Sequence, residues 1–197
     1  MGTRTNLVLG VALLVIGLVG MALTAAATQS IPSTSPGGGI LRLPSDMDAM
    51  FIEQMIPHHD DAIEMARLAA TQAEHPELRR LAGEIERAQS AENDLMRELY
   101  REWYGVGVPT DSARGMGMMG RMMSDPADMR RLAQSDPFDE AFIELMVPHH
   151  RMGIMMAQMA GGATRRPEIR ELTDSIIRSQ TAEIELMVGW YRDWYGR

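Results

Sequence analysis

Residues 51–59 read Phe-Ile-Glu-Gln-Met-Ile-Pro-His-His, and residues 142–150 read Phe-Ile-Glu-Leu-Met-Val-Pro-His-His. The likeness extends well beyond these nine positions. Residues 51–105 align with residues 142–196 at a constant offset of 91 without a gap, and 27 of the 55 aligned positions are identical. Agreement of this length indicates that the chain contains an internal duplication.

Each copy has the pattern of two helices joined by a short turn. From Ile52 to Ala70 the apolar residues recur at helical spacing, and a turn is predicted at residues 73–76, because Pro76 suits the first position of a helix. The second helix then runs to about Trp103 and ends at Gly105. Two such hairpins supply four apolar stripes, which a four-helix bundle buries most economically. The sequence therefore predicts an all-α protein.

The chain divides into a leader, a linker and the duplicated bundle. In residues 1–27, Arg4 precedes an apolar run that ends in alanines, which is typical of a signal peptide, and the run is also nearly long enough to remain as a membrane anchor. Residues 28–45 have the composition of a flexible linker. The bundle is expected over residues 46–197, with repeats 46–105 and 137–197 and a Met-rich connection, 106–136. A short helix is predicted in this connection from Pro126 to Gln134.

The composition restricts the chemistry. The net charge of −8 argues against nucleic acid, which requires a basic face. The chain has no Cys and 19 Met, so any site for a soft metal ion must use thioether and imidazole ligands.

Counting from the turn brings the two arms of each hairpin into register. His59 lies 16 residues before His75 and Glu92 lies 17 after it, so the two should be level in an antiparallel pair. A buried Glu there can hold the imidazole in the tautomer whose other nitrogen binds a metal ion. The same counts make three further pairs level: Met55 with Met96, His150 with Glu183, and Met146 with Met187. Gln89 and Gln180 lie one helical turn away from the two Glu, on the same faces. The two copies can form one central cluster or two separate sites.

The copies then diverge. The second has methionines along one side of its first helix where the first has Asp61, Glu64 and Leu68: Met152, Met155 and Met159, beside the shared Met156. Together with His149 and the Met116–Met123 loop, this face would suit Cu(I) or Ag(I). The plainer interpretation is that such residues are core, as a single Met on an apolar stripe usually is, and it applies to Met65, Met96 and Met187 individually.

Three other features lie near the pattern. Pro57 and Pro148 fall inside helical segments, where a proline removes a backbone hydrogen bond, and the resulting kink is expected to aim the paired His that follow. His75 lies in a turn and is expected to be solvated. The Trp-Tyr pairs at residues 103–104 and 194–195 are expected to close the ends of the bundle.

Phe-Ile-Glu-x-Met-[Ile/Val]-Pro-His-His, followed by Met-Ala and then by Gln-x-x-Glu-x-x-x-Met, resembles the bacterial family labelled domain of unknown function 305, over about residues 46–197 in both halves. The resemblance implies a ferritin-like fold and a periplasmic copper-binding or copper-resistance role. It also implies that Met and His of the two motifs are metal ligands: Met55, His58, His59, Met146, His149 and His150. The sequence departs from the usual pattern after each His pair, with Asp60-Asp61 in one copy and Arg151-Met152 in the other, so the two sites need not be equivalent.

The sequence thus favours a non-enzymatic, exported protein that binds Cu(I) or Ag(I), with Cu(II) as a further candidate ion, for buffering, resistance or transfer to a metal-transport or metal-accepting protein. Binding by neutral His should weaken as the pH falls through the range in which imidazole is protonated. A ferritin-like two-metal enzyme is one alternative, although the usual Glu-x-x-His spacing is absent before both His pairs. A structural or partner-binding bundle, in which His and Glu only satisfy each other, is another.

Overall fold

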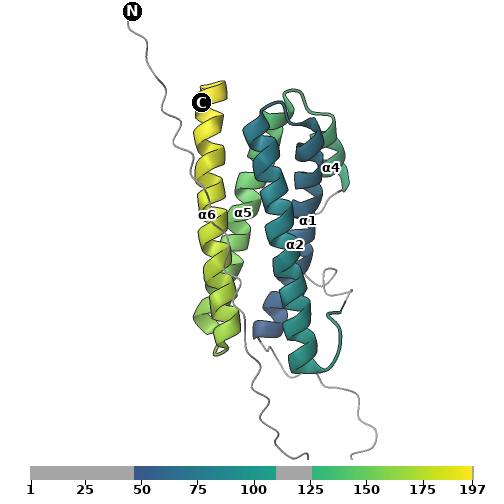
Figure 1. Ribbon diagram of the computed structural model, residues 1–197, viewed down its shortest axis with the longest axis vertical. Helices are drawn as coiled ribbons and strands as arrows, with labels where there is room; N and C mark the ends of the chain where they lie inside the picture. The colour runs from purple at the N-terminus through teal and green to yellow at the C-terminus, as the bar shows by residue number, and fades with distance from the viewer. Residues whose placement is uncertain (1–46, 110–125, 197) are drawn as a thin grey trace, which may run out of the picture. The chain divides into compact units, whose positions relative to one another are not determined.

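The computed structural model describes residues 47–109 and 126–196, and every regular element in these ranges is a helix. The first hairpin comprises α1 (Met47–Gln72) and α2 (Pro76–Tyr104), and the second comprises α5 (Phe138–Ala163) and α6 (Pro167–Tyr195), with the short α4 (Pro126–Ala133) before it (Figure 1). The predicted all-α class and the repeated helical hairpin are confirmed. The predicted leader, the linker of residues 28–45 and the Met116–Met123 loop lie outside the described residues.

The helix ends follow from local sequence. Pro76 and Pro167 each stand at the start of the second helix of a hairpin, where the missing N–H costs no intrahelical hydrogen bond. Gly105 and Gly196 end these helices with φ values of 71° and 69°, a left-handed conformation that only glycine adopts readily. The helices α1 and α5 continue through Pro57 and Pro148, so the aiming of the His pairs by a kink stays a prediction. No helix in the described ranges is long and apolar enough to cross a membrane.

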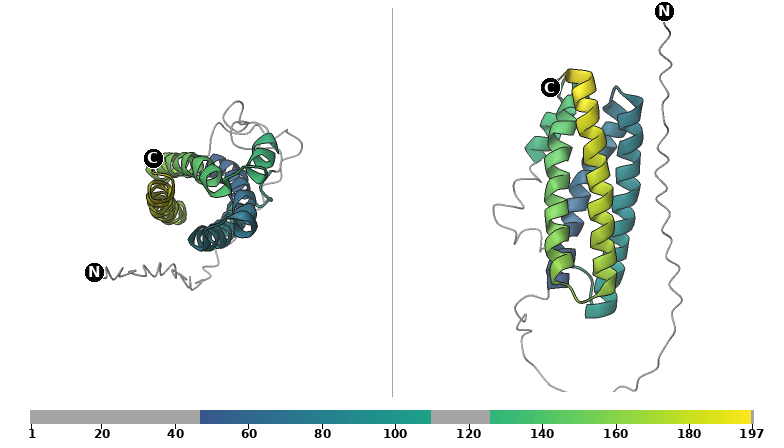
Figure 2. Two further views of the ribbon diagram at one scale, coloured as in Figure 1. Left: turned by 90° about the horizontal axis from the view of Figure 1, so that it is seen from above. Right: turned by 90° about the vertical axis from the view of Figure 1, so that its left-hand side faces the viewer.

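The four long helices form an arc. Viewed along their axes, α2, α1, α5 and α6 follow one another around an open curve (Figure 2, left). The two hairpins meet mainly through α1 and α5, whereas α2 and α6 scarcely touch. The first helix of each copy therefore lies between its own partner helix and the other copy.

Helices α1 and α5 are antiparallel, and two equivalent contacts tie their ends. The Asp139 carboxylate, at the start of α5, accepts hydrogen bonds from the backbone N–H groups of Glu74 and His75, just beyond the end of α1. At the other end, Arg166 follows α5 and lies 3.2 Å from the Asp48 carboxylate in α1. Residues 48 and 139, and residues 75 and 166, are equivalent in the duplication. The copies are thus related by an approximate twofold axis that passes between α1 and α5.

The expectation that His75 is merely solvated is wrong. Its Nδ1 lies 2.7 Å from an oxygen of Asp139, and its ring stacks on Trp194 with centroids 3.6 Å apart. Arg166 occupies the equivalent position at the other end, with its guanidinium carbon 3.9 Å from the centre of the Trp103 ring. Each tryptophan thus packs against the turn of the opposite hairpin, which agrees with the prediction that the Trp-Tyr pairs close the bundle ends.

The apolar core consists of two clusters, each built from both hairpins. One contains residues from the second halves of α1 and α6 and the first halves of α2 and α5. The other contains residues from the first halves of α1 and α6 and the second halves of α2 and α5. A group of buried polar side chains, with the four paired histidines, Gln89 and Gln180 among them, lies in the middle of the helices, between the positions that supply these two clusters. This polar layer holds the paired His.

Candidate metal centre

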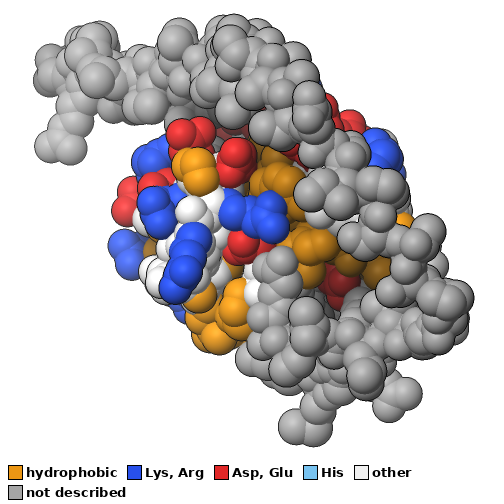
Figure 3. All heavy atoms as spheres, turned by 90° about the horizontal axis from the view of Figure 1, so that it is seen from below, with side chains coloured by type: hydrophobic (Ala, Val, Ile, Leu, Met, Phe, Trp, Pro, Cys, Tyr) orange, Lys and Arg blue, Asp and Glu red, His pale blue; other side chains and the backbone are white. Residues whose placement is uncertain are grey.

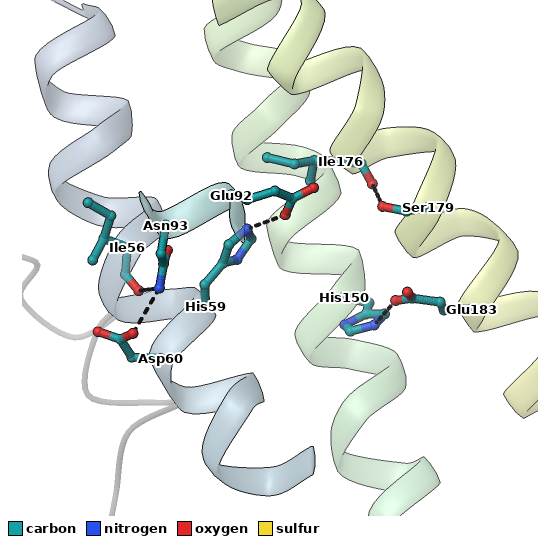
Figure 4. A network of polar contacts seen from close by, with 9 residues as sticks. All are labelled: Ile56, His59, Asp60, Glu92, Asn93, His150, Ile176, Ser179 and Glu183. Carbon is teal, nitrogen blue, oxygen red and sulfur yellow. Dashed lines mark hydrogen bonds and ion pairs between the residues drawn. The ribbon is translucent and has the colours of Figure 1, made fainter. Parts of the chain in front are cut away.

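Each hairpin contains a buried His–Glu pair at the predicted register. The His59 Nε2 lies 2.8 Å from a carboxylate oxygen of Glu92, and the His150 Nε2 lies 2.6 Å from one of Glu183 (Figure 4). Both imidazoles are completely buried, whereas the two Glu side chains keep 15% and 11% of their surface exposed. The prediction that these residues are level is confirmed. With Nε2 bonded to the carboxylate, the Nδ1 of each ring is left as the candidate metal ligand.

The other His of each pair turns towards the opposite hairpin. The rings of His58 and His149 stack with centroids 3.8 Å apart and an angle of 6° between their planes. These residues are equivalent in the duplication, so the approximate twofold axis passes beside this stack. The two adjacent histidines of each motif therefore make different contacts. The second contacts the Glu of its own hairpin, and the first stacks on the equivalent His of the other hairpin.

Burial keeps the stacked imidazoles neutral. Loss of hydration lowers the pKa of His58 to about 3, with the nearby His59 and His150 acting in the same direction. Burial also lowers the pKa of His149 well below its usual range, and the other three histidines add to the effect. A neutral imidazole retains a lone pair on one nitrogen, which is the form that binds a metal ion. On the face drawn in Figure 3, none of the uncovered atoms belongs to a histidine.

Two buried glutamines complete the polar layer. Gln89 and Gln180 are only 3% and 2% exposed. Among the described residues, nine buried side-chain atoms of these glutamines and the four histidines have no hydrogen-bond partner. They are His58 Nε2, His59 Nδ1, His150 Nδ1, both ring nitrogens of His149, and both amide atoms of Gln89 and of Gln180. Since buried polar groups are usually hydrogen-bonded, a cluster of this kind marks a place that a ligand or water completes.

Gly153 lets Gln180 and His58 approach each other. A Cβ atom at residue 153 would lie 2.6 Å from the Gln180 Oε1 and 3.0 Å from the His58 Nε2. Gln180 of the second hairpin therefore lies beside the His of the first. The equivalent of Gly153 in the first hairpin is Ala62, so the two halves of the polar layer differ here.

The methionines fall into buried and exposed groups. Met55, Met96, Met146 and Met187 are fully buried, and Met65 is 6% exposed. On α5, Met152 and Met156 are partly buried, whereas Met155 is 37% and Met159 is 61% exposed. The structure thus brings Met55 and Met96 into one core cluster and Met146 and Met187 into the other, and it leaves Met159 apart from both.

Asp60, the first acidic residue after the first His pair, is engaged elsewhere. Asn93 donates a hydrogen bond of 2.8 Å from its Nδ2 to Asp60 (Figure 4). The Arg97 guanidinium lies 3.8 Å from the same carboxylate. Within residues 47–109 and 126–196, no three His, Asp or Glu side chains are grouped so that they could hold a metal ion. A metal site in these residues therefore needs ligands of another kind, such as thioether or amide groups.

Sequence reasoning missed the contact between the hairpins. The turn supplies a reference point for counting within a hairpin, but no turn joins α1 to α5. The only available signal was the presence of adjacent His in both copies, because a residue beside a twofold axis meets its own equivalent.

Comparison with known proteins gives the family. Residues 48–191 match the family described as "Domain of unknown function (DUF305)". The chain belongs to this family. Comparison with curated protein sequences gives no match. Among solved structures, CopM in its Cu(I)-bound form is 44% identical, with a TM-score of 0.66 over 75% of this chain and 97% of CopM.

Other solved structures agree. CopM in its Cu(II)-bound form is 46% identical, with a TM-score of 0.69 over 75% of this chain and 97% of CopM, and CopM has also been crystallised with Ag. A DUF305 protein of Streptomyces coelicolor, thought to be secreted, is 28% identical, with a TM-score of 0.66 over 75% of this chain and 93% of its own. The resemblance found in the sequence is confirmed.

Proposed function

We propose that this protein binds Cu(I) or Ag(I) outside the cytoplasm, without catalysis, to buffer the ion, confer resistance or pass it to an acceptor protein. Cu(II) is a further candidate ion. The proposal is supported by the likeness to CopM, whose structures contain Cu(I), Cu(II) and Ag. The export it requires follows from the signal-like residues 1–27.

The observation that most supports metal binding is the polar layer between the two core clusters. Four buried histidines, two of them with lowered pKa values, present ring nitrogens that no protein group satisfies. Each buried polar atom without a hydrogen-bond partner costs about 1–3 kcal/mol of folding free energy. A group of such atoms is therefore unfavourable unless a bound ligand offsets the cost. Because the imidazoles are neutral and thioethers lie in the adjoining clusters, a soft monovalent ion fits this ligand chemistry.

Glu92 and Glu183 would support binding rather than coordinate the ion. Each holds the Nε2–H of its histidine, which leaves the Nδ1 of that ring free to bind. Each also places a carboxylate one imidazole away from the ion and so compensates part of its charge. Both Glu side chains keep a small exposed area, so this support lies at the edge of the buried layer.

Met155 and Met159 are placed to bind the ion at the protein surface before it reaches the interior. They lie four residues apart on the surface of α5, so the two thioethers can meet one ion, while Met152 and Met156 continue the same face inwards. Exposed ligands of this kind exchange ions readily. We propose that they collect or release the ion that the interior holds.

A competition titration tests the function. The purified protein is titrated with Cu(I) under reducing conditions against a chromogenic chelator, and then with Zn(II) and Fe(II). We expect the protein to take Cu(I) from the chelator and to lose this ability when His58, His59, His149 and His150 are replaced by Ala. The fifth histidine supplies the matched control, because His75→Gln lies outside the polar layer and should leave Cu(I) binding unchanged. Failure of the unmodified protein to compete with the chelator would refute the proposal.

A further inference from the structure

Helix α4 covers apolar surface at one end of the bundle. It lies on the convex side of the arc and packs against both α1 and α5 (Figure 2, left). Its Leu132 is fully buried, in the core cluster that also contains Phe138. Leu68 and Ala141 pack against the same cluster and are partly buried. The short helix therefore contributes to the burial of the apolar side chains around it.

The equivalent positions at the other end are exposed methionines. The offset of 91 between the repeats matches three residues of the covered end with methionine: Phe138 with Met47, Ala141 with Met50, and Leu68 with Met159. Phe138 is 5% exposed, whereas Met47 is 36% exposed. Leu68 is partly buried, whereas Met159 is 61% exposed. Met47, Met50 and Met159 are called the uncovered face below. The described part of the first hairpin begins at Met47, so it includes no counterpart of α4.

The chain supplies its own candidate to cover this face. The same offset, continued towards the N-terminus, pairs Leu41 with the buried Leu132 (132 − 91 = 41). Helix α5 begins at Phe138, six residues after Leu132, and α1 begins at Met47, six residues after Leu41. Because the connecting length is the same in both copies, the chain before α1 has the reach to place a leucine where α4 places Leu132.

We infer that residues 41–46, which lie outside the described residues, form a strap whose Leu41 packs on the uncovered face and covers Met159. Removing the leucine and the methionines from water favours this contact. The strap is joined directly to α1, so it meets the face at a high effective concentration. This advantage favours it over a second copy of the chain as the occupant.

A strap in this position regulates the surface pair Met155 and Met159. It covers the thioether of Met159. It leaves Met155 open, because the equivalent of Met155 at the covered end is Glu64, which stays exposed. A single thioether is a weaker ligand than two that meet one ion, so the strap has to move before the pair can bind. The position of the strap follows from the duplication, and only this consequence rests on the proposed function.

Oxidation of the full chain by hydrogen peroxide tests the strap in the absence of metal. Peroxide transfers one oxygen atom to an accessible thioether, which becomes a sulfoxide, and water is released. Initial rates for each methionine are read by mass spectrometry of peptides. Met159 should be oxidised more slowly than Met155, although it is 61% exposed in the structure and Met155 only 37%. Leu41→Asp should speed the oxidation of Met159 by about tenfold, a ratio that the burial of one leucine can sustain, and leave Met155 unchanged.

Leu43→Asp is the matched control, because the offset pairs Leu43 with Gln134, which is exposed. It adds the same charge two residues away and should leave both rates unchanged. Faster oxidation of Met159 than of Met155 in the unmodified chain would overturn the inference, and so would equal Met159 rates in all three proteins.

Protection of Met159 that survives Leu41→Asp and rises with protein concentration would also overturn it, since a second copy would then cover the face. The assay contains no metal, so none of these outcomes bears on the proposed function. Conversely, a failure of the protein to take Cu(I) from the chelator would refute the proposed function and leave the strap standing.

Discussion

Gly153→Ala sets two opposing effects against each other in the polar layer. In a helix interior, exchanging Gly for Ala stabilises a protein by roughly 0.5–1 kcal/mol, because the unfolded chain loses conformational freedom. Here the new methyl group would lie 2.6 Å and 3.2 Å from the two amide atoms of Gln180 and 3.0 Å from the His58 ring. Forcing an extra methyl group into a packed interior costs about 1–3 kcal/mol. The two side chains that must move are 2% and 6% exposed, so they have little room to do so.

We therefore expect Gly153→Ala to lower the free energy of unfolding by about 1 kcal/mol, the excess of overpacking over the helical gain. Gly189 supplies the control. It lies inside α6, and a Cβ atom there would meet nothing within 4 Å among the described residues. Gly189→Ala should stabilise the protein by roughly 0.5–1 kcal/mol.

Urea unfolding followed by circular dichroism measures both free energies. A double-mutant cycle with Gln180→Ala assigns the cause, because removing the Gln180 side chain should make Gly153→Ala less harmful. If Gly153→Ala stabilises the protein as much as Gly189→Ala, the close approach of Gln180 and His58 to α5 is not a packing constraint and the reasoning is refuted.

The remaining predictions concern charge. Glu92→Gln and Glu183→Gln should each weaken Cu(I) binding by about 10–100-fold in the chelator competition, because the imidazole loses its anionic support; unchanged affinity would exclude that role. The lowered pKa values of His58 and His149 mean that the unfolded chain binds protons at a higher pH than the folded one. Metal-free stability should therefore be complete above about pH 6.5 and fall below it by about 1.4 kcal/mol per pH unit for each residue, and His58→Gln should reduce the slope seen in unfolding curves at pH 7, 6 and 5. Asp139→Asn should cost about 1–3 kcal/mol in urea unfolding, since the buried carboxylate accepts the N–H groups of the turn after α1, whereas Asp193→Asn on the surface should have little effect.

The structure within each hairpin was predictable because it depends on short-range information. Pro76 and Gly105 mark the ends of a helix through their own backbone chemistry, and the turn fixes which residues of the two arms are level. The contacts His59–Glu92 and His150–Glu183 follow from counting residues along antiparallel helices of constant rise.

The structure between the hairpins was not predictable in this way. The relative position of α1 and α5 depends on how two apolar surfaces fit, and side-chain volumes decide that fit more than periodicity does. The His58–His149 stack and the Asp139–His75 contact both cross this interface.

The duplication resembles a symmetric dimer whose two subunits share one chain. In such an arrangement a residue beside the axis meets its own equivalent, so a single motif supplies both sides of a site. A joined chain frees the copies to diverge, which a homodimer does not allow. Ala62 and Gly153 differ beside the axis, and Glu64 and Met155 differ on the exposed face of the first helix. The matched methionines and histidines keep the interior nearly symmetric, whereas on the outer face of the second hairpin Met155 and Met159 stand where the first has Glu64 and Leu68. If the ion exchanges through the proposed pair Met155 and Met159, it enters and leaves beside α5, although the interior of the fold is nearly symmetric.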